Sequence, residues 1–139
     1  MTDALASGSL AHTEVLLLTH ASVASALAGL ASHVFGPEVH RRIGICELDV
    51  DAPPQAELGV ALAWSGEHRD SWVLVLTDLH GSTPWRVGQD LVTQLGPSRA
   101  RALSGVNAPM LLAVIERWDT LPLDGLVRRA RVAGRRGIA

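Results

Sequence analysis

Short runs of consecutive apolar residues, each followed by a polar turn and a helical repeat, constrain the fold of this chain more than any other feature. Val15–Thr19 (VLLLT) and Ser71–Thr77 (SWVLVLT) are the clearest runs. Such runs are typical of strands buried on both faces, as in parallel sheets covered by helices. Weaker runs within Arg42–Val50 and at Arg101–Ser104 complete a set of four predicted strands.

Helical patterns follow the runs along the chain. Ser22 is a typical N-cap residue, and the apolar repeat after it stops at Gly36–Pro37. Strands and helices that alternate through short loops predict a single-domain α/β fold, a doubly wound, mostly parallel sheet with helices on both faces. The predicted helices cover Val23–Phe35, Gln55–Trp64, Val87–Leu95, Met110–Trp118 and Leu123–Ala133.

The length of 139 residues suits one domain. We expect residues 1–12 to form a flexible N-terminal tail and residues 13–139 to form the domain. Residues 1–12 lack the basic and apolar regions of a signal peptide, and no apolar stretch is long enough to span a membrane. The single Cys46 lies within an apolar run, as a buried thiol in a reducing compartment would. We therefore expect a cytoplasmic protein.

Charge and residue usage exclude several classes of function. The net charge of −2 gives no strong field toward nucleic acid or an anionic membrane. All twelve basic residues are arginine, so no Walker-A, Schiff-base or Ser–Lys lysine exists. We interpret the one basic cluster as a solvated helix face; it comprises Arg128, Arg129, Arg131, Arg135 and Arg136.

Polar residues that end the predicted strands indicate where a site would lie. In an open α/β sheet, ligands bind beyond the carboxyl ends of the strands, where the strand order reverses. The first strand ends at His20 and the third is followed by Asp78. If the strand order is 2-1-3-4, these two side chains face one crevice.

Such a pair suits phosphoryl transfer. A neutral imidazole is a good nucleophile toward phosphorus, and a carboxylate that accepts one ring N–H aims the other nitrogen outward. The start of the helix after His20, at Ala21 and Ser22, offers backbone N–H groups to phosphate oxygens. Gly81, Ser82 and Thr83, in the turn-rich segment Asp78–Pro84, add further donors.

Each element also has a structural interpretation. A histidine at a strand end can be incidental, an aspartate there often forms a turn or a helix cap, and Gly-Ser-Thr-Pro clusters mark ordinary turns. A metal site is a weak alternative, because the other histidines are scattered and no paired metal-ligand motif exists.

Three segments together resemble the IIA component of the mannose/fructose family of the bacterial phosphoenolpyruvate-dependent sugar phosphotransferase system (PTS). Leu16–Leu27 (LLLTHASVASAL) is similar to the family's Thr-His strand end, and Val73–Val87 (VLVLTDLHGSTPWRV) to its Thr-Asp-Leu loop. Leu103–Arg117 (LSGVNAPMLLAVIER) is similar to its Ser-Gly-Val-Asn segment, and Gly134–Ile138 (GRRGI) also matches.

The resemblance implies a sheet of order 2-1-3-4 and a homodimer that exchanges a C-terminal strand. It implies a protein-histidine phosphotransferase in which His20 accepts a phosphoryl group from the carrier HPr, while Asp78 holds the ring. His20 then passes the group to a IIB component during sugar uptake. No cofactor, metal, nucleic acid or membrane insertion is implied.

The chain departs from the family pattern around the expected site. Ala21 stands in place of a usual glycine, which should restrict the local backbone. His80 replaces an aromatic residue, and Ser82 replaces a glycine. Arg86 replaces an asparagine, and we expect it to contact a phosphate or an acidic partner. Ala108 replaces a leucine.

Three alternative functions stay open. A standalone regulatory phosphoprotein would use His20 to control partner binding without transporting sugar. A flavodoxin-like ligand-binding module would use no phosphorylation. A receiver domain phosphorylated on Asp78 would need a lysine and an acidic metal site, and the chain has no lysine.

Overall fold

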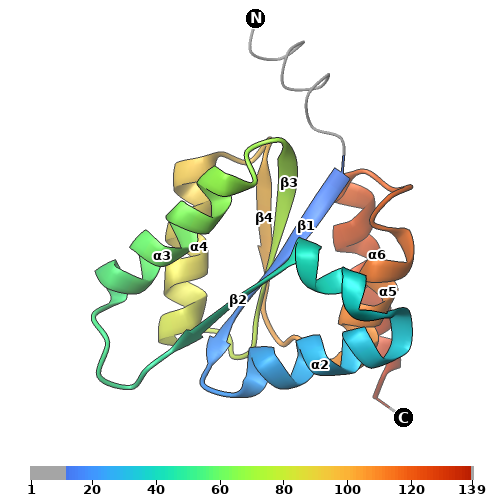
Figure 1. Ribbon diagram of the computed structural model, residues 1–139, viewed down its shortest axis with the longest axis horizontal. Coiled ribbons are helices and arrows are strands. Elements are labelled where there is room, and N and C mark those ends of the chain that lie inside the picture. Colours follow the sequence, from blue (N-terminus) through green and yellow to red (C-terminus); the bar gives the residue numbers. More distant parts are fainter. Residues whose placement is uncertain (1–11, 139) are drawn as a thin grey trace, which may run out of the picture.

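A four-stranded parallel sheet forms the centre of the molecule (Figure 1). The structure is a computed structural model that describes residues 12–138. The strands are β1 (His12–His20), β2 (Ile43–Leu48), β3 (Ser71–Thr77) and β4 (Ala100–Leu103). Their order is β2-β1-β3-β4 and every neighbouring pair is parallel, which confirms the predicted 2-1-3-4 order.

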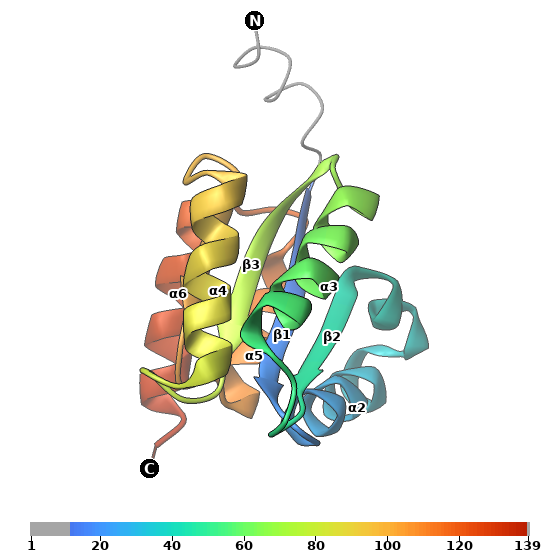
Figure 2. The ribbon, with the colours of Figure 1, turned by 90° about the vertical axis from the view of Figure 1, so that its left-hand side faces the viewer.

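Helices cover both faces of this sheet (Figures 1 and 2). One face carries α3 (Pro54–Glu67) and α4 (Thr83–Leu95). The other carries α2 (Val23–Phe35), α5 (Ala108–Arg117) and α6 (Leu123–Arg136). The fold is therefore the doubly wound α/β architecture that the alternating pattern predicts.

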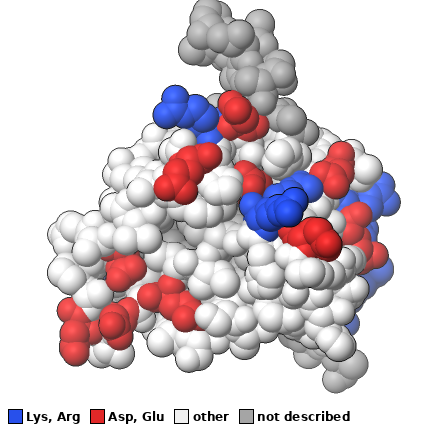
Figure 3. Space-filling view, viewed as in Figure 1, with Lys and Arg blue, Asp and Glu red and all other residues white. Residues whose placement is uncertain are grey.

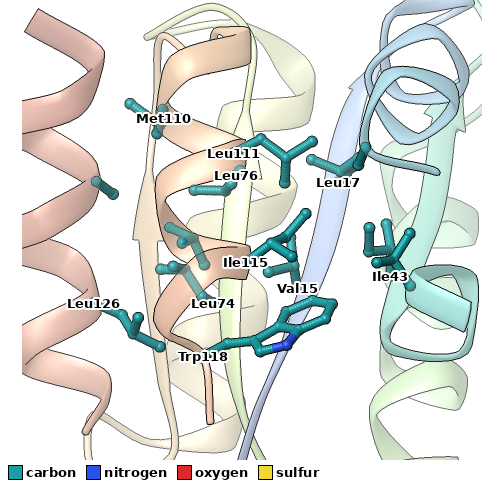
Figure 4. Packing of buried hydrophobic residues seen from close by; sticks show 14 of the residues in the cluster. Val15, Leu17, Ile43, Leu74, Leu76, Met110, Leu111, Ile115, Trp118 and Leu126 are labelled. Carbon is teal, nitrogen blue, oxygen red and sulfur yellow. The ribbon is translucent and has the colours of Figure 1, made fainter. Parts of the chain in front are cut away.

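Strand β1 contributes side chains to two hydrophobic cores, one on each face of the sheet, because successive side chains of a strand point to opposite faces. Val15 and Leu17 join the core beneath α2, α5 and α6, which Figure 4 shows from close by. Leu16 and Leu18 join the core beneath α3 and α4. All four are at most 1% exposed. A continuous apolar run is thus required, since neither face of the strand meets water.

Several boundaries differ from the sequence prediction. Helix α4 begins at Thr83, four residues before the predicted start, because Ser82 caps it and Pro84 suits its first turn. Helix α3 runs to Glu67, and α6 to Arg136. A six-residue 3₁₀ helix, η1 (Pro37–Arg42), stands where only a break was predicted.

Two expectations concern the ends of the chain: a flexible N-terminal tail and a C-terminal strand. Strand β1 begins at His12, the last residue of the expected tail, and the rest of that segment lies outside the described residues. Within residues 12–138 no strand follows β4, and Gly134–Arg136 belong to α6. The resemblance placed a C-terminal strand after this point, and the described residues do not contain it. None of the helices within residues 12–138 is long and apolar enough to cross a membrane.

The strand register brings the carboxyl ends of β1 and β3 to one edge of the sheet. Leu18 lies opposite Thr77, the last residue of β3, and β1 continues for two residues to His20. Asp78 follows Thr77 directly. The side chains of His20 and Asp78 therefore start from neighbouring positions on adjacent strands.

Candidate functional site

His20 and Asp78 form a direct contact at this edge. Nδ1 of His20 lies 2.8 Å from Oδ2 of Asp78, and the backbone N–H of His20 donates to the same oxygen at 3.1 Å. The His20 side chain is 49% exposed and that of Asp78 is 15% exposed. A carboxylate can only accept hydrogen bonds, so Nδ1 carries a hydrogen, and in the neutral imidazole Nε2 then holds the free lone pair. The structure thus brings together the two residues that the strand ends predict.

A two-residue turn, Ala21–Ser22, joins His20 to α2. Thr19 holds this turn from below, because its buried hydroxyl donates to the carbonyl of His20 at 2.8 Å and accepts from the N–H of Ala24 at 2.9 Å. Ser22 has a φ of 75°, while Ala21 is not among the residues with positive φ. The strained position is therefore Ser22, and the restriction expected from Ala21 does not arise.

A pocket of about 550 Å³ opens beside His20. Three helices begin at its wall, since Ala21 precedes α2, Pro54 begins α3, and Thr83 and Pro84 begin α4. Each helix N-terminus carries a partial positive charge of roughly half an elementary charge, so these starts favour an anion in this pocket. Of the expected phosphate contacts, Ala21 and Thr83 line this pocket.

Helix α2 does not offer all the free N–H groups that the sequence predicts. The N–H of Ala24 is bound by Thr19, and the N–H of Ser25 donates to Oε2 of Glu47 at 2.7 Å. Hydrogen bonds from Ser25, first that of its backbone N–H, lower the pKa of Glu47. Ser22 occupies the N-cap position, yet its side chain makes no capping hydrogen bond. Thr19 and Glu47 take that role instead.

Ser82 is likewise used by the fold. Its hydroxyl donates to the carbonyl of Leu79 at 2.6 Å and accepts from the N–H of Trp85 at 3.5 Å, which caps α4. The single hydroxyl hydrogen of Ser82, which we expected to donate to a phosphate, is therefore already used in a hydrogen bond within the loop. Gly81 has a φ of +83° and turns the loop ahead of this cap. Neither residue lines the pocket at His20.

Arg86 and His80 lie away from the pocket at His20. The Arg86 side chain is exposed, and neither residue is part of that pocket's lining. The ring of His80 packs against Trp85, with the ring centroids 4.7 Å apart. Both residues therefore lie outside the lining of the pocket at His20.

Three residues at this site, Thr19, Glu47 and Asp49, were not predicted from the sequence. Glu47, the next-to-last residue of β2, caps α2, and Asp49 lines the pocket beside His20. The rule that selected His20 and Asp78, polar residues at strand ends, also applies to the second strand. That rule would have found Glu47 and Asp49 had it been used there.

The described residues contain no group of three or more His, Cys, Asp or Glu side chains placed to hold a metal ion. The arrangement at His20 provides a nucleophilic nitrogen, a carboxylate that orients it, and a pocket that favours anions.

Known structures share this fold. The phosphotransferase system component EIIA from Streptococcus agalactiae matches with a TM-score of 0.78 and 22% identity, over 91% of this chain and 95% of that one. The PTS IIA protein associated with the fucose utilization operon from Streptococcus pneumoniae matches with a TM-score of 0.74 and 25% identity, over 88% and 91%.

The mannose/sorbose-specific IIA subunit of the phosphotransferase system from Enterococcus faecalis matches with a TM-score of 0.76 and 19% identity, over 91% and 92%. A search of curated protein sequences gives no match.

A family model covers most of the described chain. The model for the PTS system fructose IIA component matches residues 14–130, a range that includes both His20 and Asp78. This chain therefore belongs to the fructose/mannose IIA family of the sugar phosphotransferase system.

Proposed function

We propose that the protein is a phosphocarrier that accepts a phosphoryl group on Nε2 of His20 from phosphorylated HPr and passes it to a IIB component during sugar uptake. Membership of the family implies a phosphotransfer role in the sugar PTS. Beyond that family role, we propose His20 Nε2 as the phosphorylated atom, and HPr and a IIB component as the partners. We also propose that the protein works in the cytoplasm as a homodimer.

The observation that carries the proposal is the 2.8 Å contact between Nδ1 of His20 and Oδ2 of Asp78. The second bond from the His20 N–H to the same oxygen fixes the carboxylate relative to the main chain. Asp78 holds Nδ1, and the His20 side chain as a whole is 49% exposed. We therefore expect a partner to reach Nε2 without a change in the fold.

The transfer step conserves its atoms and electrons without a proton transfer. The lone pair of Nε2 attacks phosphorus while the bond between phosphorus and the donor imidazole nitrogen breaks. The electron pair of that bond stays on the donor ring, whose other nitrogen carries a hydrogen, so the donor departs as a neutral imidazole. His20 keeps its Nδ1 hydrogen and becomes an imidazolium-like phosphohistidine. The charge of Asp78 stabilises that ring, as carboxylates do beside catalytic histidines.

The surroundings of His20 favour the transferred group. The N-terminal ends of α2, α3 and α4 meet at the pocket, and their partial charges act where the phosphoryl charge develops. Because one imidazole nitrogen replaces another, the step is close to balanced in free energy. Positioning and charge stabilisation then supply the rate.

An acidic rim beside the pocket indicates the charge of the partners. Three acidic residues occupy alternate positions at the end of β2 and in the loop to α3, namely Glu47, Asp49 and Asp51. Figure 3 shows acidic side chains gathered over this region, with no Lys or Arg among them in that view. Val50, at 98% exposed, lies in the same loop. This rim suits a docking partner with a basic face.

Incubation with ³²P-labelled phospho-HPr tests the proposal. We expect one acid-labile, base-stable phosphoryl group, located on His20 by mass spectrometry. His20→Ala should abolish labelling, whereas His33→Ala, which removes another exposed histidine, should label at the wild-type rate. Label that persists in His20→Ala would move the function to another residue.

The regulatory alternative depends on the same phosphohistidine and differs in the next step. A chase of the labelled protein with a IIB component separates the two. Transfer of the label to IIB supports the carrier role, and retention of the label on His20 supports the regulatory one.

A further inference from the structure

A second pocket, of about 540 Å³, opens where the loop after β4 meets α4 and α6. Its volume falls within the range of roughly 300–1,000 Å³ typical of small-molecule sites. It shares no lining residue with the pocket at His20. The β3–α4 loop carries both Asp78, which contacts His20, and His80, which lines this second pocket.

The charge lining this pocket is entirely positive. Arg131 and Arg135 stand one helical turn apart on α6 and both line it. Within residues 12–138 neither guanidinium makes an ion pair, whereas Arg129 on the same helix pairs with Glu116. No Asp or Glu lines the pocket. Two members of the basic cluster, both exposed, thus line a cavity.

The helix ends around the pocket do not cancel this charge. The last turn of α6 presents carbonyl groups whose summed effect is roughly half a negative charge. Two guanidiniums outweigh it, and α5, which begins at Ala108 beside the lining residue Asn107, presents its positive end there. The net field in the pocket attracts an anion.

The other lining residues indicate the chemistry of the rest of the ligand, the part attached to its anionic group. The indole of Trp85 lies in the wall, tilted at 53° to the ring of His80, and it offers an apolar surface. Gln89 and Ser104 add neutral groups that both donate and accept. Asn107 is already engaged, because it donates to the carbonyl of Gly134 at 2.9 Å and accepts from the N–H of Met110 at 3.0 Å.

We propose that this pocket binds a small phosphorylated sugar. Arg131 and Arg135 hold the phosphate, since a planar guanidinium matches phosphate oxygens in pairs. Trp85 packs against the apolar face of the sugar ring, and Gln89 and Ser104 bond its hydroxyls. The site does not depend on the chemistry of His20, so it is separate from the proposed phosphocarrier function.

Isothermal titration calorimetry with a panel of hexose phosphates tests this site. We expect at least one, with glucose 6-phosphate as the first probe, to bind with a dissociation constant below about 1 mM. The double variant Arg131→Gln/Arg135→Gln should weaken that binding by about tenfold or more, because both phosphate contacts lose their charge. Glucose and inorganic phosphate, each lacking half of the contacts, should bind more weakly than the hexose phosphate.

A matched control separates the pocket from general charge. Arg128→Gln/Arg136→Gln removes two arginines from the same helix that line the groove between α5 and α6 instead. It should bind the hexose phosphate as the wild type does. An equal loss in both double variants, inorganic phosphate that binds as tightly as the hexose phosphate, or no saturable binding across the panel would each overturn the proposal. His20→Ala should bind unchanged, so failure of the phosphocarrier function would not be mistaken for failure here.

Discussion

Asp78 uses a single oxygen, Oδ2, to hold both the backbone N–H and the ring Nδ1 of His20, at 3.1 and 2.8 Å. Its other oxygen, Oδ1, is buried and has no hydrogen-bond partner among the described residues. The carboxylate is therefore committed to His20 alone. This links the orientation of the ring to the main chain, so that the ring is positioned before a partner arrives.

We expect Asp78→Asn to fold normally and to accept a phosphoryl group about tenfold to a hundredfold more slowly than the wild type. The variant keeps the shape but loses the charge that stabilises the phosphorylated ring, and hydrogen bonds to charged groups contribute about 1.5–3 kcal/mol. Single-turnover transfer from phospho-HPr measures the rate. Asp90→Asn, an exposed change on α4 that lines neither pocket, is the control, and equal rates in wild type and Asp78→Asn would remove Asp78 from the mechanism.

We expect Glu47→Gln to reduce stability at neutral pH, by about 0.5–1 kcal/mol if it acts as an exposed helix cap does. Because hydrogen bonds from Ser25 hold the pKa of Glu47 below its ordinary value, the unfolded chain takes up this proton first as the pH falls. The stabilisation is thus present above about pH 4.5 and disappears as the pH falls through the lowered pKa.

Urea denaturation at pH 7 and at pH 3.5 measures this effect. The difference between wild type and Glu47→Gln should shrink at the lower pH. Glu67→Gln, at the end of α3, should show no such trend. A difference that is independent of pH would mean that Glu47 does not act through its charge.

We expect Gly44→Ala to destabilise the protein by about 1–3 kcal/mol, the usual cost of overpacking a core. A Cβ at this position of β2 would lie 2.5 Å from Cε2 of Trp64 and 2.9 Å from Cδ1 of Leu16. Gly59→Ala, on the exposed face of α3 with no atom within 4 Å of the added carbon, should instead stabilise by about 0.5–1 kcal/mol. Denaturant titration of both variants checks the contrast, and a loss in both would point to helix α3 as a whole.

We expect Cys46 to react with a thiol reagent at pH 8 at least about a hundredfold more slowly in the folded protein than in urea. Burial, and then the nearby carboxylate of Glu57, raise the pKa of the Cys46 thiol to about 12, so the thiolate is scarce. Sγ lies 3.6 Å from Oε2 of Glu57. Stopped-flow labelling measures both rates, and rapid labelling of the native protein would show that the thiol is accessible and ionised.

The two-sided burial of β1 could be predicted from sequence, because a run such as Val15–Leu18 has no stable place other than between two helical layers. The strand order was an implication of the family resemblance, and the structure confirms it. The pairing of His20 with Asp78 followed from that order, since parallel strands end at a common edge. The family was also recognisable, from three segments whose order and content are specific.

Other features depend on contacts between separate segments, and local sequence patterns do not report them. Ser82 looks like a phosphate donor in sequence, and only the path of the loop shows that its hydrogen goes to Leu79. Glu47 reaches the start of α2 only because β2 lies beside β1. Helix α4 begins at Thr83 because Ser82 caps it, and apolar periodicity does not report such a cap.

The sequence by itself determined the alternation of strands and helices, the candidate nucleophile and its carboxylate, because these follow from apolar periodicity and from which residue ends each strand. Tertiary structure alone decided which donors stay free for a phosphate and which arginines of α6 converge on a cavity. The physical reason is that a hydrogen bond between distant segments, such as Ser25 with Glu47, exists only once the sheet has set their separation.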